Sequence, residues 1–180
     1  MRMNELEHSS QDPPEPETGD EKEVYAFYGL ASYNAQVAER GLMQLALLLH
    51  LQRIPNATCA TYDQEYEALA RRSFGQILTE LAGDQTLAND LRALLQKALG
   101  LRNHLTHHFF WDFAEEWFSQ EGRLLMIQKL REATALFCEV GDKVARVVDD
   151  LGKNLGIGHD TVLRMYERLL NESRQKYNSA

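Results

Sequence analysis

Apolar residues recur every three or four positions through most of the chain from Glu21 to Leu151, a spacing that places them on one face of an α-helix. No segment shows the two-residue alternation of a half-buried strand. With 180 residues, the chain is long enough for one substantial core. The sequence therefore predicts an all-α fold, an up-and-down helical bundle of four to five helices in one domain over residues 21–178.

The interruptions of this periodicity set the expected helix boundaries. The first helix should run from Glu21 to about Arg53, where Pro55 and Asn56 end it. Four further helices are expected over residues 62–82, 87–113, 119–151 and 161–176. Gly83-Asp84 closes the second of these five helices, and Thr86 is the expected N-cap of the third.

Residues 1–20 are acidic and contain three of the four prolines. Such a composition buries too little apolar surface to offset the entropy of ordering, so we expect a disordered tail. The net charge of the chain is −8, of which residues 1–23 alone carry −6. The remaining residues carry only −2, and the overall acidity is therefore a weak argument against a nucleic-acid partner for the folded domain.

The cysteines and the apolar runs indicate the cellular compartment of the protein. Cys59 and Cys138 have no CxxC partner, and the N-terminus carries no apolar signal segment, which together favour a reducing cytosol without disulfides. The longest apolar run, Leu45 to Leu49, is far shorter than the roughly 20 residues of a membrane-spanning helix. We expect a cytoplasmic protein with no membrane partner.

The third expected helix carries the one unusual local pattern, an arginine followed by an amide and then by a histidine: Arg102, Asn103 and His107. In this pattern the chain resembles the HEPN superfamily, whose signature is an arginine, a polar residue and a histidine after four to six intervening positions. The resemblance in architecture covers about residues 24–150. It includes a long first helix with Glu39, a second helix with the sequence Ser73-Phe74-Gly75-Gln76, and Phe109-Phe110 after the histidine.

This resemblance implies an all-helical endoribonuclease that acts on RNA without a metal or other cofactor. It also implies a homodimer in which the two motifs meet in one cleft, and a toxin–antitoxin or phage-defence setting with an antitoxin or regulatory protein as partner. In toxin–antitoxin pairs of the superfamily a tyrosine often stands two positions after the histidine, where a partner enzyme modifies it. Phe109 occupies that position here, so the resemblance does not carry this modification over.

The chemistry of the side chains assigns the roles. Arg102 is expected to bind phosphate, because guanidinium offers planar, charge-assisted and bidentate donors. His107 is expected to transfer a proton, because imidazole changes its charge near neutral pH. Asn103 would orient His107 or the phosphate. Four further residues are expected to support the site: His108, Thr106, His104 and Glu39.

Helix geometry adds an expectation about the direction of these side chains. At about 100° per residue, Asn103 and His107 lie about 160° from a core stripe that includes Leu101 and Leu105, and Arg102 lies at its flank, about 60° away. The outward face is too apolar for simple exposure, and Gly100 allows the close approach of another backbone. We expect this face to contact a second copy of the chain through a mixed set of residues: Arg92, Gln96, Leu99, Gly100, Thr106 and Phe110.

Other interpretations of the same residues remain open. The motif residues could be polar surface side chains, with Arg102 paired to an acid such as Glu39. His108 is expected to be a partly buried, hydrogen-bonded histidine. His104, His108 and Asp112 have a spacing that could hold a metal ion, but no HExxH pattern accompanies them, and no metal site is expected. The aromatic residues are expected to fill the core and the interface: Phe109, Phe110, Trp111, Phe113, Trp117 and Phe118.

Two other functions compete with the ribonuclease. One is a catalytically silent HEPN-like bundle that binds RNA, a nucleotide or a protein partner. The other is a regulatory bundle in which the acidic tail and the last helix engage a partner and the histidines are incidental.

Overall fold

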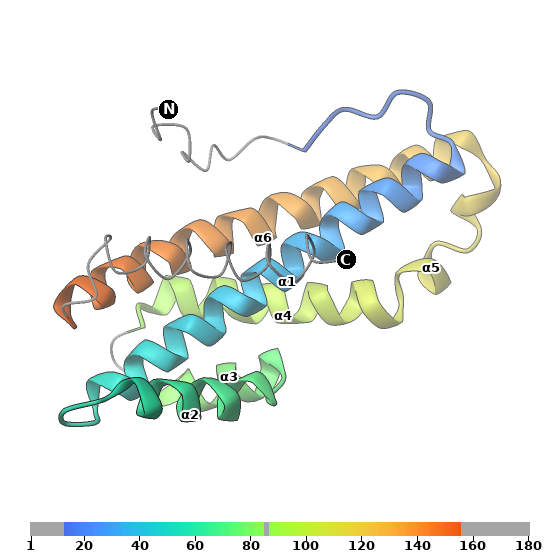
Figure 1. Cartoon of the computed structure of the whole chain (residues 1–180). Coiled ribbons are helices and arrows are strands. Elements are labelled where there is room, and N and C mark those ends of the chain that lie inside the picture. Colours follow the sequence, from blue (N-terminus) through green and yellow to red (C-terminus); the bar gives the residue numbers. More distant parts are fainter. Residues whose placement is uncertain (1–12, 85–86, 156–180) are drawn as a thin grey trace, which may run out of the picture.

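The structure, a computed structural model of the chain, describes residues 13–84 and 87–155. Within these residues all regular structure is helical, with no strand, which confirms the all-α bundle. Three long helices form its body: α1 (Glu21–Gln52), α4 (Asn89–His107) and α6 (Gln120–Asn154). Figure 1 shows that α1 and α6 run in the same direction and that α4 runs in the opposite one.

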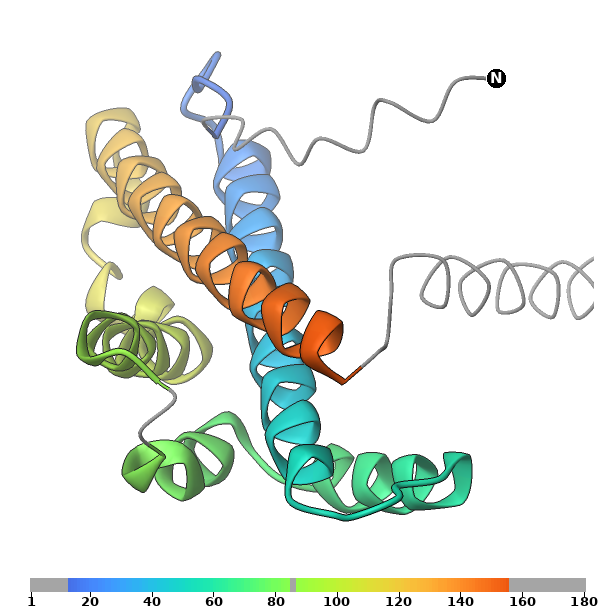
Figure 2. The ribbon, with the colours of Figure 1, turned by 90° about the vertical axis from the view of Figure 1, so that its left-hand side faces the viewer.

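Helix α1 is the central element because α6, α4 and the shorter helices α2 (Cys59–Ala70) and α3 (Phe74–Glu80) all pack against it. The small side chains of Ala31, Ala35 and Ala38 are buried along its middle. From Leu45 to Leu49 every residue is buried. This all-round burial follows from the position of α2 and α3, which lie at the C-terminal end of α1 (Figure 2).

The single helix expected over residues 62–82 is two helices, α2 and α3, followed by a 3-10 turn over Leu81–Gly83. Helix α3 begins after Ser73, whose hydroxyl accepts from the Gln76 N–H while the Gln76 carboxamide accepts from the Ser73 N–H. This reciprocal cap satisfies backbone donors that a continuous helix would have bonded internally, so it starts a new helix. The pattern Ser-x-x-Gln is visible in the sequence.

The third expected helix is also broken. It ends at His107, and a short helix α5 (Phe109–Asp112) follows after His108, which has non-helical dihedral angles (φ −129°, ψ −23°). Ala88 stands at the N-cap of α4 and makes no side-chain cap, and the expected cap Thr86 lies outside the described residues. A 3-10 turn (Glu116–Phe118) leads to α6, which Ser119 caps through Gly122 N–H. The helix expected over 161–176 lies outside the described part of the chain.

Residues 13–20, which the sequence assigns to a disordered tail, have a defined path along α6. Three α6 side chains donate hydrogen bonds to their carbonyl oxygens: Arg131 to Pro13 (3.1 Å), Gln120 to Thr18 (2.8 Å) and Arg123 to Gly19 (2.9 Å). The structure differs from the expectation here because donors more than a hundred residues away satisfy this backbone. Residues 1–12 lie outside the described part.

Among the helices of the described residues, none combines the length and the apolar character that crossing a membrane requires.

Candidate functional site

Arg102, Asn103 and His107 lie in the last turns of α4. The buried residues within this helix are Leu91, Leu95, Ala98 and Leu105. Arg102 falls on the same line, four positions after Ala98 and three before Leu105, so the expected position at the flank of the core stripe is wrong. The actual stripe is rotated from the expected one because Leu94 and Leu101 are only partly buried.

Arg102 reaches from this inward position to an acid on α1. Its Nη2 lies 3.6 Å from Oε2 of Glu39, and the two side chains are 33% and 26% exposed. The other carboxylate oxygen of Glu39 accepts a hydrogen bond from the backbone N–H of Phe74, at 3.1 Å. Glu39 therefore joins three helices, α1, α3 and α4, and limits the directions that the guanidinium can take. The pairing of Arg102 with Glu39 that the sequence left open is present.

Asn103 and His107 are exposed, as the helix geometry predicted. The Asn103 carboxamide oxygen accepts a hydrogen bond from Arg102 Nη1 at 3.3 Å, which draws the guanidinium toward the outward face. His107 lies one turn beyond Asn103. Its ring lies 6.3 Å from the ring of His108, and its side chain makes no hydrogen bond or ion pair with any described residue. The end of α4 thus offers an oriented cation, an amide and an unengaged imidazole.

The four supporting residues take different places. Glu39 contacts Arg102, whereas Thr106 uses its hydroxyl to donate to the Arg102 carbonyl oxygen at 2.9 Å and so serves the helix itself. The expectation for His108 is wrong: it is exposed, and its side chain has no hydrogen bond within residues 13–84 and 87–155. It leaves the core because the helix breaks at this residue.

His104 Nε2 lies 2.9 Å from Oδ2 of Asp112, so these two residues of the possible metal triad meet. His108 stacks beside His104 at a ring distance of 6.4 Å. In the part of the chain that the structure describes, no group of three histidine, cysteine or acidic side chains is arranged to hold a metal ion. The contact between His104 and Asp112 fixes α5 against the last turn of α4.

The end of α4 is anchored to α1 through Tyr28. Its hydroxyl donates to the Leu105 carbonyl oxygen at 3.1 Å, and its ring contacts Phe109 and Phe110 at 5.9 and 4.9 Å between centroids. Phe109 is buried, as expected for a core residue. Because Leu105 lies between Asn103 and His107, the Tyr28 contact holds the backbone that carries the motif.

Three of the six aromatic residues expected to fill the core and the interface are exposed on this chain: Phe110, Trp111 and Phe118. Phe110 is 37% exposed and keeps a ring contact with Tyr28. Trp111 is 83% exposed and Phe118 is 86% exposed. Asp112, next to Trp111 in the sequence, and Glu115, three residues before Phe118, are also exposed, so each ring has an exposed acid close to it in the chain. The exposure of Trp111 was missed because the break at His108 rotates α5 away from the direction that a continuous helix would have given. Phe118 lies in the 3-10 turn before α6.

The outward face expected for dimer contact is only partly present. Arg92 donates to the carbonyl oxygens of Leu81, Asp84 and Leu87, and so fixes the connection into α4. Leu99 is partly buried and packs against the core. Gly100 is exposed, and a Cβ built on it would meet nothing within 4 Å. The exposed part of this face is thus narrower and more polar than the sequence suggested.

No known protein family matches the chain, and no curated protein or solved structure is similar enough to count as a match.

Proposed function

We propose that the chain is a HEPN-type endoribonuclease that cleaves RNA without a metal ion. The observation that carries the proposal is the arrangement around Arg102. Its guanidinium is oriented by Glu39 (3.6 Å) and Asn103 (3.3 Å), and the unengaged imidazole of His107 lies one helical turn beyond Asn103. A cation with a fixed direction next to a free acid or base is what cleavage of a phosphodiester by an internal nucleophile requires.

In the proposed reaction the 2′-oxygen of the RNA attacks the phosphorus, and the bond from phosphorus to the 5′-oxygen breaks. A base removes the proton of the 2′-hydroxyl, and an acid protonates the departing 5′-oxygen, so the products are a 2′,3′-cyclic phosphate and a 5′-hydroxyl. Arg102 binds the phosphate and stabilises the charge that develops on it. His107 transfers the protons, and Asn103 keeps Arg102 directed toward the phosphate.

The proposal includes a homodimer. Asn103, Thr106 and His107 are exposed on one chain, and two imidazoles are needed if one acts as the base while the other acts as the acid. Two copies that meet through the ends of α4 supply both. The resemblance implies a toxin–antitoxin or defence setting. In such a setting, an antitoxin or another regulatory protein would inhibit the chain by covering the same face.

The test is incubation of the purified chain with mixed RNA in EDTA, followed by analysis of the product ends. The proposal predicts cleavage that leaves 2′,3′-cyclic phosphate and 5′-hydroxyl ends. Cleavage that EDTA abolishes and zinc restores would contradict it, and so would the absence of cleavage on every RNA tried.

A second candidate, a catalytically silent bundle that binds a protein partner, is favoured by one observation. Trp111 and Phe118 are almost fully exposed beside acidic residues, which suits a partner that presents basic and apolar side chains. Substitution of Trp111 by alanine distinguishes the two functions, because it weakens partner binding in the second candidate and leaves RNA cleavage unchanged in the first.

A further inference from the structure

A depression of about 490 Å³ lies between α3 and α4. The depression is open to solvent, so a planar ring system would lie against its surface and not be enclosed by it. We refer to it as the α3–α4 depression, and it is lined by Ser73, Gly75, Gln76, Thr79, Gln96 and Leu99.

The lining of the α3–α4 depression is neutral and combines an apolar surface with amide groups. Gly75 presents no side chain, and Leu99 provides the apolar surface beside it, 3.6 Å from where a Cβ of Gly75 would stand. Gln96 is exposed, and its carboxamide has no hydrogen bond to any described residue. A carboxamide donates and accepts at once, which matches the mixed donor and acceptor edge of a nucleobase.

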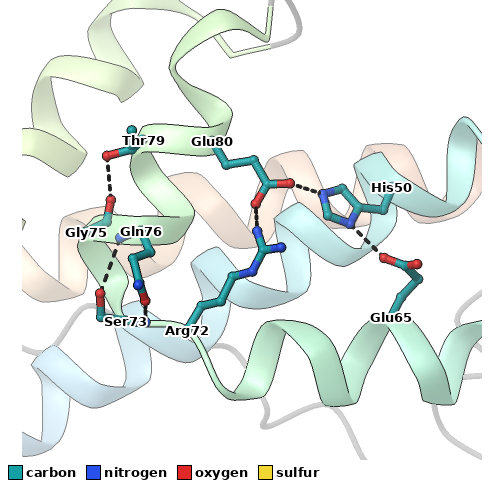
Figure 3. A network of polar contacts seen from close by, with 8 residues as sticks. All are labelled: His50, Glu65, Arg72, Ser73, Gly75, Gln76, Thr79 and Glu80. Atoms are coloured by element: carbon teal, nitrogen blue, oxygen red, sulfur yellow. Dashed lines mark hydrogen bonds and ion pairs between the residues drawn. The ribbon is translucent and has the colours of Figure 1, made fainter.

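The wall formed by α3 is fixed by polar contacts at both ends of the helix (Figure 3). At its start, Ser73 and Gln76 form the reciprocal cap. At its end, the Glu80 carboxylate lies 2.9 Å from His50 Nε2 and also pairs with Arg72. His50 in turn contacts Glu65 of α2 through Nδ1, at 2.9 Å. Because α1 and α2 both hold α3, the wall is preorganised for a ligand.

The α3–α4 depression lies next to the proposed phosphate site. Leu99 precedes Arg102 by three residues on α4, so both lie on neighbouring turns of one side of the helix. Phe74, between Ser73 and Gly75, donates its N–H to Glu39, and Glu39 also pairs with Arg102. Two contacts, from Phe74 N–H to Glu39 and from Glu39 to Arg102, therefore connect the rim of the depression to the guanidinium.

From these observations we propose that the α3–α4 depression is a nucleobase subsite, which holds the base of an unpaired nucleotide whose phosphate contacts Arg102. The neutral lining offers no cation to the phosphate itself, whereas an uncharged ring can lie against the adjoining surfaces of Gly75 and Leu99 with its edge toward Gln96. This assignment rests on the proposed function and adds to it: the substrate is single-stranded at the site of cleavage, and cleavage depends on the base.

The test uses the full chain and, as ligands, the four nucleoside 3′-monophosphates, which lack the bond from phosphorus to a 5′-oxygen that the proposed reaction breaks. Gly75→Ala is the diagnostic change. Its methyl group would meet Leu99 at an ordinary contact distance of 3.6 Å, so the fold is kept while the depression narrows. Gly29→Ala is the matched control, because it places the same methyl group on the exposed surface of α1 with nothing within 4 Å.

We expect saturable binding with a preference among the four bases. Gly75→Ala and Gln96→Ala should each weaken it by about five- to tenfold, the ratio that one lost hydrogen bond or close contact produces. Gly29→Ala should leave it unchanged. Binding that Gly75→Ala and Gln96→Ala do not alter, or no saturable binding of any of the four nucleotides, would overturn the subsite.

Cleavage of RNA by the same chain separates the two proposals. If it cuts RNA and Gly75→Ala leaves both the rate and the base preference unchanged, the subsite is wrong and the ribonuclease stands. If the nucleotides bind as expected and no RNA is cut, the subsite stands and the ribonuclease is wrong.

Discussion

Glu39 of α1 pairs with Arg102 of α4, with Oε2 and Nη2 3.6 Å apart. The same carboxylate accepts from Phe74 N–H at the start of α3, so one side chain fixes the arginine and the helix beside it. A carboxylate next to a phosphate-binding cation also lowers the attraction of that cation for phosphate. In the proposed site, Glu39 would therefore weaken the binding of phosphate to Arg102 while it fixes the orientation of the guanidinium.

Substitution of Glu39 by glutamine tests this exchange. The amide oxygen can still accept from Phe74 N–H, whereas the negative charge that faces Arg102 is removed. We expect tighter RNA binding at low salt and cleavage slower by about tenfold, because small displacements of a positioned group cost up to about 10²-fold in rate. Filter binding and single-turnover cleavage measure the two effects.

Glu132→Gln is the control, since it also removes one carboxylate that pairs with a cation, here Lys129 on α6. The positioning role would be refuted if Glu39→Gln and Glu132→Gln changed binding and cleavage to the same extent.

Arg102→Lys separates charge from geometry. Lysine keeps the positive charge but loses the planar pair of donors that reaches both Glu39 and Asn103. We expect RNA binding close to that of the unaltered chain and cleavage that is only partly retained, with Arg102→Ala lower in both. Full activity of Arg102→Lys would show that the guanidinium geometry has no role.

Gly122 in the first turn of α6 should not tolerate a side chain. A Cβ there would stand 2.2 Å from the Glu116 carbonyl oxygen, and backbone atoms cannot move aside cheaply. We expect Gly122→Ala to destabilise the chain by about 1–3 kcal/mol, which lowers the melting temperature by roughly 2–4 °C per kcal/mol. Gly141→Ala, with nothing within 4 Å, should be neutral or stabilising. Equal melting temperatures for the two variants would contradict this packing.

Local signals explain why the long helices could be predicted. The start of α1 is as expected, and its end differs from the expected one by one residue. This end could be predicted because Pro55 and Asn56 follow it within a few residues. The start of α6 follows Ser119, a side-chain cap that the sequence displays. The break between α2 and α3 could also have been predicted, because Ser73 and Gln76 have the spacing of a capping box. The path of residues 13–20 was not, since it depends on donors of α6 that only the folded chain brings near.

The N-terminal segment should loosen in acid because of Glu23. The backbone N–H groups of Glu17, Gly19 and Thr18 donate to its carboxylate and lower its pKa from the ordinary value of 4.5. A lowered pKa in the folded state stabilises the fold above the ordinary carboxyl range, and this stabilisation is lost as the pH falls through the folded-state pKa.

We therefore expect Glu23→Gln to lower the stability at pH 7 and to have less effect as the pH is lowered, as measured by urea unfolding at several pH values. Glu121→Gln, which removes another exposed acid near the same end of the bundle, should show no such trend. A pH-independent loss in Glu23→Gln would mean that the carboxylate charge is not what holds this segment.

In the site, the sequence predicted the side-chain exposure that follows from the periodicity of a single helix. It did not predict the contacts that depend on how two helices pack. The exposure of Asn103 and His107 followed from the periodicity of α4. The inward position of Arg102 was missed because Leu94 and Leu101, which set the expected stripe, are only partly buried. Its contact with Glu39 was one option among several until the packing of α4 on α1 was known.

The rate of RNA cleavage by His107→Ala, measured in EDTA beside His108→Ala, tests the central claim most directly. Both histidines are exposed, and they are neighbours in the chain, so the two variants differ chiefly in which imidazole is lost. If His107 transfers the proton, His107→Ala reduces the rate by about 10²–10⁴-fold with little change in RNA binding, and His108→Ala stays near the unaltered rate. Unchanged cleavage in His107→Ala together with a loss in His108→Ala would contradict the account.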